Sequence, residues 1–157
     1  MGPQGLPPGI DASQLAEWPQ RAIGWLIDAI AFVGLWIVFY VLSLVIGFFI
    51  GLLGDLCALA IGCFLAYQVG AFGSTPGMRI AGVKCVSIKT GQPLGVGMGF
   101  LRWIIHIVAS ILCLVPFIVD MLFPLWDSQK QTLADKIGGS IVITVPKQPF
   151  AIMPKTP

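Results

Sequence analysis

The chain has 157 residues, of which 57% are hydrophobic and only 10% are charged. Soluble domains carry about 25% charged residues, so this composition excludes an ordinary soluble domain, and its high hydrophobicity excludes a disordered chain. The net charge of +2 is too small for the concentrated basic surface that nucleic-acid binding needs. We therefore expect an all-α polytopic membrane protein, with the lipid bilayer as its surroundings and no nucleic-acid partner.

The chain begins with a polar segment that is followed by long apolar runs. Residues 1–18 are rich in glycine and proline, lack the features of a signal peptide, and are expected to form a disordered tail. The first apolar run covers residues 22–53 and is longer than the roughly 20 residues that cross a bilayer. It predicts a transmembrane helix over 19–45, with 47–55 as a turn or a helical extension. A second transmembrane helix is predicted over 56–72.

A small β element is predicted outside the membrane. Turn signals at 75–77 and 90–93 flank an alternating stretch at 83–88, which is typical of a short strand. The β-branched run at 140–145 could pair with this strand in a small cytoplasmic sheet if both lie on one side of the membrane. The membrane domain is thus predicted over 19–145, and residues 146–157 are expected to form a second disordered tail.

The third apolar region, residues 96–126, has two possible paths. Its 31 residues are too few for two full spans. The positive-inside rule places the N-terminus and the loop 73–95 in the cytoplasm. A re-entrant hairpin bent near Pro116 would also bring the four C-terminal lysines to the cytoplasm, and we favour it. A single span, with the C-terminus outside, is the alternative.

Five polar side chains interrupt the apolar runs and are the candidate site residues. Arg21 and Asp28 are seven residues apart and point to one face of the first helix. Asp28 is either an ion or proton site or, as we favour, a structural residue that is neutral or paired with a basic residue of another helix. Arg102 and His106 share a face of their helix and are its candidate partners. Asp120 is a second possible intramembrane acid or, as we favour, an interfacial residue.

Small residues recur every fourth position in the second helix, which lets another helix approach closely. They pack either inside this chain or against another subunit, and they are Ala58, Gly62, Ala66 and Gly70. The chain has four cysteines without a CxxC pair and a single histidine, so we expect no metal site and no cofactor. No activated nucleophile can be named, and we expect no enzyme activity.

Three segments resemble the RDD family, membrane proteins named for one arginine and two aspartates. The sequence RAIGWLID supplies Arg21 and Asp28 and opens the first helix as in that family. GSTPG at 73–77 is similar to the family's GxTxGK-type segment. PLWDSQKQTLADKI at 124–137 is similar to its closing motif, which assigns the second aspartate to Asp135.

The resemblance covers residues 19–145 and has one departure. Met78 stands where the family usually has a basic residue, and Arg79 follows it. TGQPLG at 90–95 and the N-terminal tail look most like actinobacterial members that are rich in proline and glycine. If Arg21 and Asp135 interact, they lie on the same side of the membrane, which the hairpin allows and the single span forbids.

Two functions remain open at this point. The resemblance implies either an accessory part of a larger membrane assembly or sodium/proton antiport. We favour a non-enzymatic accessory or assembly subunit in the plasma membrane, with a cytoplasmic N-terminus, because two or three spans make a poor solitary pathway. The alternative is a cation/proton carrier that acts as a homo-oligomer through Asp28.

Overall fold

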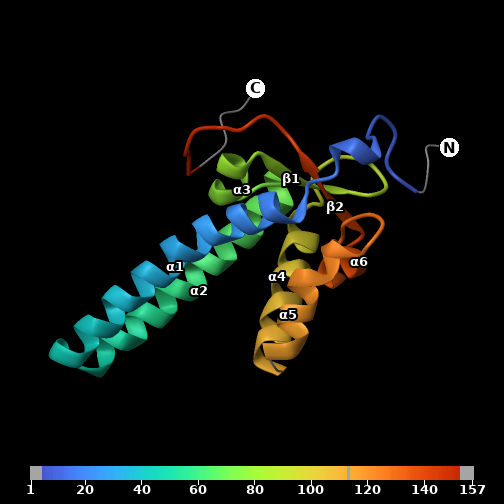
Figure 1. Ribbon diagram of the computed structural model, residues 1–157. Helices are drawn as coiled ribbons and strands as arrows, with labels where there is room; N and C mark the ends of the chain where they lie inside the picture. The colour runs from blue at the N-terminus through green and yellow to red at the C-terminus, as the bar shows by residue number, and fades with distance from the viewer. Residues whose placement is uncertain (1–4, 113, 153–157) are drawn as a thin grey trace.

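Two long helices form the main hairpin of the computed structural model, which describes residues 5–112 and 114–152, without the side chains of 109–117. They are α1 (Trp18–Ile46) and α2 (Phe48–Phe72), and they lie side by side in Figure 1. Both are long and apolar enough to cross a membrane. The predicted first helix is confirmed to within one residue at each end. Residues 48–55 are helical, so α2 begins eight residues before the predicted position.

Gly47 makes the sharp connection between the two helices. Its φ of 112° lies in the region that L side chains rarely adopt. Its N–H donates to the carbonyl of Ser43 at 2.9 Å, which closes the last turn of α1. The single glycine thus ends one helix and lets the next begin at once.

The third apolar region forms a shorter hairpin of α4 (Val96–Leu112) and α5 (Leu114–Leu122), followed by the 3-10 turn η2 (Phe123–Leu125). In Figure 1, α5 returns beside α4 toward the small sheet, as the hairpin alternative predicts. His106 Nδ1 on α4 lies 3.0 Å from Asp120 Oδ2 on α5. Pro116 falls in the first turn of α5, where proline is tolerated, and residue 113, between α4 and α5 in the sequence, lies outside the described residues.

Strands β1 (Val83–Ser87) and β2 (Ser140–Thr144) pair antiparallel, with Val86 opposite Ile141. This pairing confirms the predicted sheet. Because β1 follows the first hairpin in the sequence and β2 follows the second, the sheet joins the chain segments that leave the two hairpins. Two short helices that the pattern does not predict, α3 (Pro76–Ala81) and α6 (Leu133–Gly138), flank the strands.

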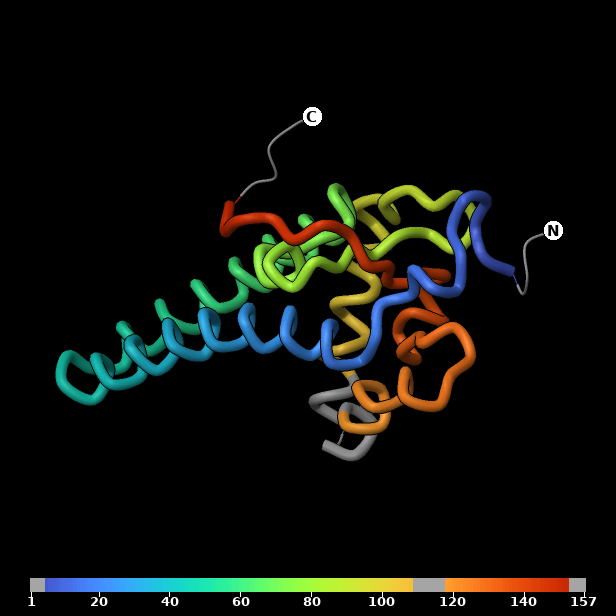
Figure 2. The backbone as a smooth tube through the Cα atoms, turned by 45° about the horizontal axis from the view of Figure 1, so that its top comes forward, coloured from blue at the N-terminus to red at the C-terminus, as the bar shows by residue number. Residues whose placement is uncertain are grey.

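The N-terminal segment packs on the sheet, which corrects the expected disorder of residues 5–16. After the 3-10 turn η1 (Ala12–Gln14), the N–H of Ala16 donates to the carbonyl of Val142 at 2.9 Å. Leu15 is buried with Val86 and Ile141. Apolar side chains among the prolines and glycines therefore dock the segment, and Figure 2 shows it (blue) beside the C-terminal strand (red).

We call β1, β2, α3 and α6 together the small domain. The C-terminal segment also lies against this small domain, as far as residue 152. The N–H of Val145 donates to the Gly82 carbonyl at 2.8 Å, and that of Gln148 donates to the Arg79 carbonyl at 3.0 Å. Residues 146–152 form no regular secondary structure, yet these bonds hold them along α3. The remainder of the predicted tail, 153–157, lies outside the described residues.

The stripe of small residues on α2 packs inside the chain. A Cβ atom built on Gly62 would lie 2.8 Å from the Trp103 ring, and one on Gly70 would lie 2.6 Å from the Gly95 carbonyl oxygen. Ala66 is buried in the same row, and Ala58 is half-buried. The stripe therefore brings α4 against α2, and this contact occupies the face that could have received another subunit.

Candidate functional site

A buried carboxylate joins the two hairpins and the small domain. Asp135 of α6 is fully buried, and its oxygens lie 2.9 Å from Arg21 Nη1 and 2.6 Å from Arg102 Nη1. Arg21 stands in the first turn of α1 and Arg102 in α4. We call these three residues the Arg–Asp–Arg cluster. The interaction between Arg21 and Asp135, which the sequence leaves as a condition, is present in the structure.

Local hydrogen bonds fix the orientation of Asp135. The Thr132 hydroxyl accepts from the Asp135 N–H at 3.0 Å, and the Asp135 carboxylate accepts from the Thr132 N–H at 3.1 Å. This reciprocal pair begins α6 as a capping box. The Ser140 hydroxyl donates to the other carboxylate oxygen at 2.9 Å. Neither Thr132 nor Ser140 stands out in the sequence, because both lie in ordinary polar or β-branched stretches.

Electrostatics favour the ionised form of Asp135. Burial by itself would raise the pKa of this carboxyl, but the guanidinium groups of Arg102 and Arg21 outweigh it and hold the pKa below its usual value. The pKa of Asp127, in the loop before α6, is also lowered: burial opposes this, but the hydrogen bond and charge of Lys136, together with the backbone hydrogen bonds from Gln131 and Gln129, outweigh it.

Acid should therefore destabilise the fold through Asp135. A carboxyl whose folded-state pKa is below its unfolded value of about 4 contributes stability that is present above that value and lost as pH falls through the folded pKa. Thermal unfolding followed by tryptophan fluorescence should give a constant midpoint from neutral pH to about pH 5 and a falling midpoint below about pH 4. Asp127→Asn should keep most of this fall, and a midpoint that stays flat into strong acid would contradict the assignment.

Asp28 is held by the start of α3, and not by the basic residues of α4. It accepts hydrogen bonds from the Thr75 hydroxyl and from the Gly77 N–H, the latter at 2.8 Å. The expectation that Arg102 or His106 pairs with Asp28 is wrong. Sharing a face of α4 does not determine which carboxylate the two side chains reach. In the described structure Arg102 pairs with Asp135, and His106 lies against Asp120.

Asp120 links α5 to α6 as well as to α4. Besides its contact with His106 Nδ1, it accepts a hydrogen bond from the Ala134 N–H at 2.9 Å. Asp120 is buried although it lies close to the end of the apolar region. It thus positions α6, and with it Asp135, against the second hairpin.

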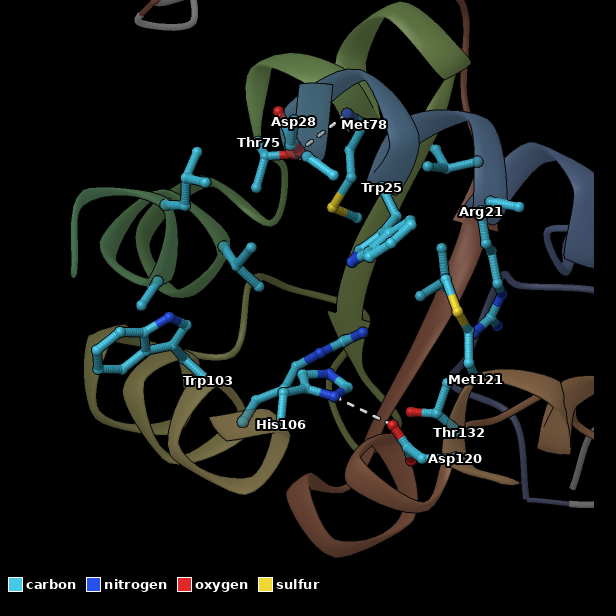
Figure 3. A pocket seen from close by; sticks show the side chains of 18 of the residues that line it. Arg21, Trp25, Asp28, Thr75, Met78, Trp103, His106, Asp120, Met121 and Thr132 are labelled. Atoms are coloured by element: carbon cyan, nitrogen blue, oxygen red, sulfur yellow. Dashed lines mark hydrogen bonds and ion pairs between the residues drawn. The ribbon is translucent and has the colours of Figure 1, made fainter. Parts of the chain in front are cut away.

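An apolar pocket of about 530 Å³ opens between the two hairpins beside these polar groups. Its walls include Trp25 and Phe32 of α1, Leu65 of α2 and Trp103 of α4. Figure 3 shows Asp28 with Thr75 at one end of this pocket and His106 with Asp120 at another. Within the part of the chain that the structure describes, no three His, Cys, Asp or Glu side chains meet as metal ligands would. The pocket is therefore best suited to an apolar group, with polar side chains at its ends.

Comparisons with known proteins identify the family of this chain. The model of the RDD family matches residues 15–139. The proline-rich antigen of Mycobacterium leprae is 43% identical over 79 residues, which are 50% of this chain and 30% of that protein. A proline-rich antigen homolog of Mycobacterium tuberculosis is equally similar, over 31% of its length. The match thus spans less than a third of these relatives, and no solved structure matches.

The region matched by the family model, residues 15–139, contains both hairpins, strand β1 and the whole Arg–Asp–Arg cluster. It also contains Asp28 and the GSTPG segment that holds it. The family model covers well over half of the chain, and its matched residues include the three motifs at 21–28, 73–77 and 124–137. This chain belongs to the RDD family and is a membrane protein.

Proposed function

We propose that this protein is a non-enzymatic accessory or assembly subunit of a larger complex in the cell membrane. The observation that carries the proposal is the placement of its ionisable groups. Asp28 is followed in α1 by 18 residues without a charged side chain, which is about 27 Å of helix at 1.5 Å per residue. In α2 only Asp55 is charged, and its carboxylate accepts a hydrogen bond from Trp36 Nε1 at 3.2 Å. Helices α1 and α2, which are described over their whole length, therefore offer an ion no row of charged groups across the membrane.

Both termini are proposed to face the cytoplasm. The sheet, α3, α6 and the two terminal segments gather at one end of the hairpins in Figure 1. Most basic residues of the described chain belong to these elements or to the first turn of α1, and the positive-inside rule assigns such an end to the cytoplasm. The α4–α5 hairpin would then be re-entrant, entering the membrane and returning to the same side. Neighbouring protein can make the hydrogen bonds that irregular backbone needs at membrane depth.

The outer half of the α1–α2 hairpin needs apolar surroundings. Its tip is covered by exposed apolar side chains, such as Val45 (85% exposed) and Phe49 (82%). Such a surface is stable in lipid or against another membrane protein. An accessory subunit would use this hairpin to remain in the bilayer while its small domain is presented on one side.

A cation/proton carrier remains the second candidate function, because Asp28 borders the pocket between the hairpins. Such a carrier would have to form a homo-oligomer, since the polar groups of one chain stop short of the far side. The two candidates predict different behaviour of Asp28→Asn. A carrier variant would fold and lose transport, whereas a variant of a structural residue would lose abundance or assembly.

The test combines purification with transport assays on the full chain. Tagged protein extracted from its own membranes in a mild detergent should carry a larger membrane protein in fixed stoichiometry. Reconstituted vesicles should show no sodium-driven proton flux above protein-free vesicles. Asp55→Asn serves as the control, because it removes the other carboxylate of the spanning helices. Flux by a homo-oligomer that Asp28→Asn abolishes and Asp55→Asn preserves would contradict the proposal.

A further inference from the structure

A buried arginine lies outside the Arg–Asp–Arg cluster, in α3. Arg79 is 3% exposed, and its Nη2 donates to Gln68 Oε1 at 2.6 Å. The same nitrogen donates to the backbone carbonyls of Ala151 and Ile152 at 3.0 and 3.2 Å. Gln68 Nε2 also donates to the Ile152 carbonyl, at 2.7 Å. The C-terminal segment thus supplies the acceptors for both side chains.

The hydrogen bonding of Arg79 is incomplete. Its Nε and Nη1 atoms are buried and have no hydrogen-bond partner, and no carboxylate of the described residues lies within ion-pair distance of its guanidinium group. The charge of Asp28 favours the charged form of Arg79 from a distance, but the hydrogen bonds of the Asp28 carboxylate are with Thr75 and Gly77. A buried N–H group without an acceptor is unfavourable, and so is a buried charge without a counter-ion in direct contact. An anion bound here would supply both the missing hydrogen-bond acceptors and a counter-ion in direct contact with the guanidinium group.

The segment that covers Arg79 is held mainly through its backbone. Phe150 and Ile152 are 67% and 62% exposed, so neither side chain anchors residues 146–152 in a core. Its described hydrogen bonds to Arg79 and Gln68 use main-chain groups only. The segment can therefore move away without opening the sheet or either hydrophobic cluster.

The surroundings of Arg79 favour a negatively charged ligand at the membrane boundary. Lys147 lies beside Gly82, and Lys84 lies beside Gly73 at the end of α2. Gln68 stands in the last two turns of α2, close to the level at which a spanning helix meets the headgroups. Anionic lipids of the cytoplasmic leaflet attract such basic groups.

We propose that Arg79 and Gln68 form a binding site for a phosphate group, carried by the headgroup of an anionic phospholipid. The guanidinium group offers a planar set of donors that matches phosphate oxygens, and the buried Nε and Nη1 atoms are its unused donors. The carbonyls of Ala151 and Ile152 occupy the place of phosphate oxygens in this structure. Binding of the phosphate displaces residues 148–152 from Arg79.

Hydrogen exchange of the Gln148 amide reports this displacement, because that amide donates to the Arg79 carbonyl. The full chain is placed in a maltoside detergent and a phosphate-free buffer, and phosphatidylglycerol or diacylglycerol with the same acyl chains is added. Phosphatidylglycerol should raise the exchange rate about tenfold, and diacylglycerol should leave it unchanged. A third sample with inorganic phosphate distinguishes the sources. A response to inorganic phosphate but not to phosphatidylglycerol would overturn the lipid assignment, and a response to neither would overturn the site.

Two charge-matched variants make the test specific. Arg79→Gln should remove the response to phosphatidylglycerol, whereas Lys89→Gln, in an exposed turn away from the site, should retain it. If Arg79→Gln does not elute as a single species, Arg79→Lys keeps the charge without the planar set of donors and should reduce the response. Equal responses of wild type, Lys89→Gln and the Arg79 variant would mean that the lipid is attracted only by the overall charge of the protein. This result would contradict the proposal.

Discussion

Replacing Asp135 by asparagine should cost about 3–5 kcal/mol of stability, the loss typical of removing one partner from a buried ion pair. The substitution keeps the size of the side chain and removes its charge. Arg21 and Arg102 would then remain in the protein interior without the carboxylate that lies 2.9 and 2.6 Å from them. We expect a large fall in the thermal midpoint and in the amount of protein recovered from membranes.

Asp127→Asn is the matched control for this substitution. Asp127 also pairs with a basic residue, Lys136, at 2.6 Å, but the lysine side chain is 43% exposed. Exposed pairs contribute about 0–1 kcal/mol, and the asparagine oxygen can still accept from the backbone. If Asp135→Asn and Asp127→Asn unfold at the same temperature, the cluster does not hold the two hairpins together.

Gly77→Ala should destabilise the protein by about 2–4 kcal/mol through overpacking and a disturbed hydrogen bond. A Cβ atom at this position would lie 2.7 Å from Asp28 Cγ and in direct collision with the carbonyl oxygen of Gly24. The first contact is with the carboxylate that the Gly77 N–H binds, and the second is with the backbone of α1. Helix α3 would have to move away from α1, and chemical denaturation followed by tryptophan fluorescence would measure the loss.

Gly97→Ala provides the comparison, since the same methyl group there meets nothing within 4 Å. Gly97 lies near the start of α4, where alanine favours the helix by up to about 1 kcal/mol over glycine. We expect this variant to be neutral or slightly stabilised. A Gly77→Ala protein as stable as Gly97→Ala would contradict the close packing of α1 on α3.

The apolar runs and the turn signals predict most of the architecture. The length of the first run predicts α1, and the alternating stretch at 83–88 predicts β1. The charge distribution favours a third region that turns back, which α4 and α5 do. These features depend on the length of apolar runs, on alternation along a strand and on the distribution of charge, all of which can be read directly from the sequence.

The partners of the polar residues could not be predicted in the same way. Asp135 stands beside Lys136 in a polar stretch and would be solvated on local grounds, yet tertiary packing buries it completely. The resemblance to the RDD family, and not periodicity, identifies it. Arg79 gives no local signal that distinguishes it from a solvated loop residue. Leu15 is missed because no repeat of apolar residues surrounds it in the N-terminal segment.

Accessibility of single cysteines tests the central claim, that the sheet and both termini lie on one side of the membrane. The native cysteines are replaced, and one cysteine at a time is placed at Ser13, Thr90, Lys136 or Lys147. A membrane-impermeant maleimide should label all four positions in inverted vesicles and none in intact cells. Labelling of a cysteine at position 136 or 147 from outside the cell, with cysteines at positions 13 and 90 labelled from inside, would contradict the account. The Arg–Asp–Arg cluster and the sheet could not then form.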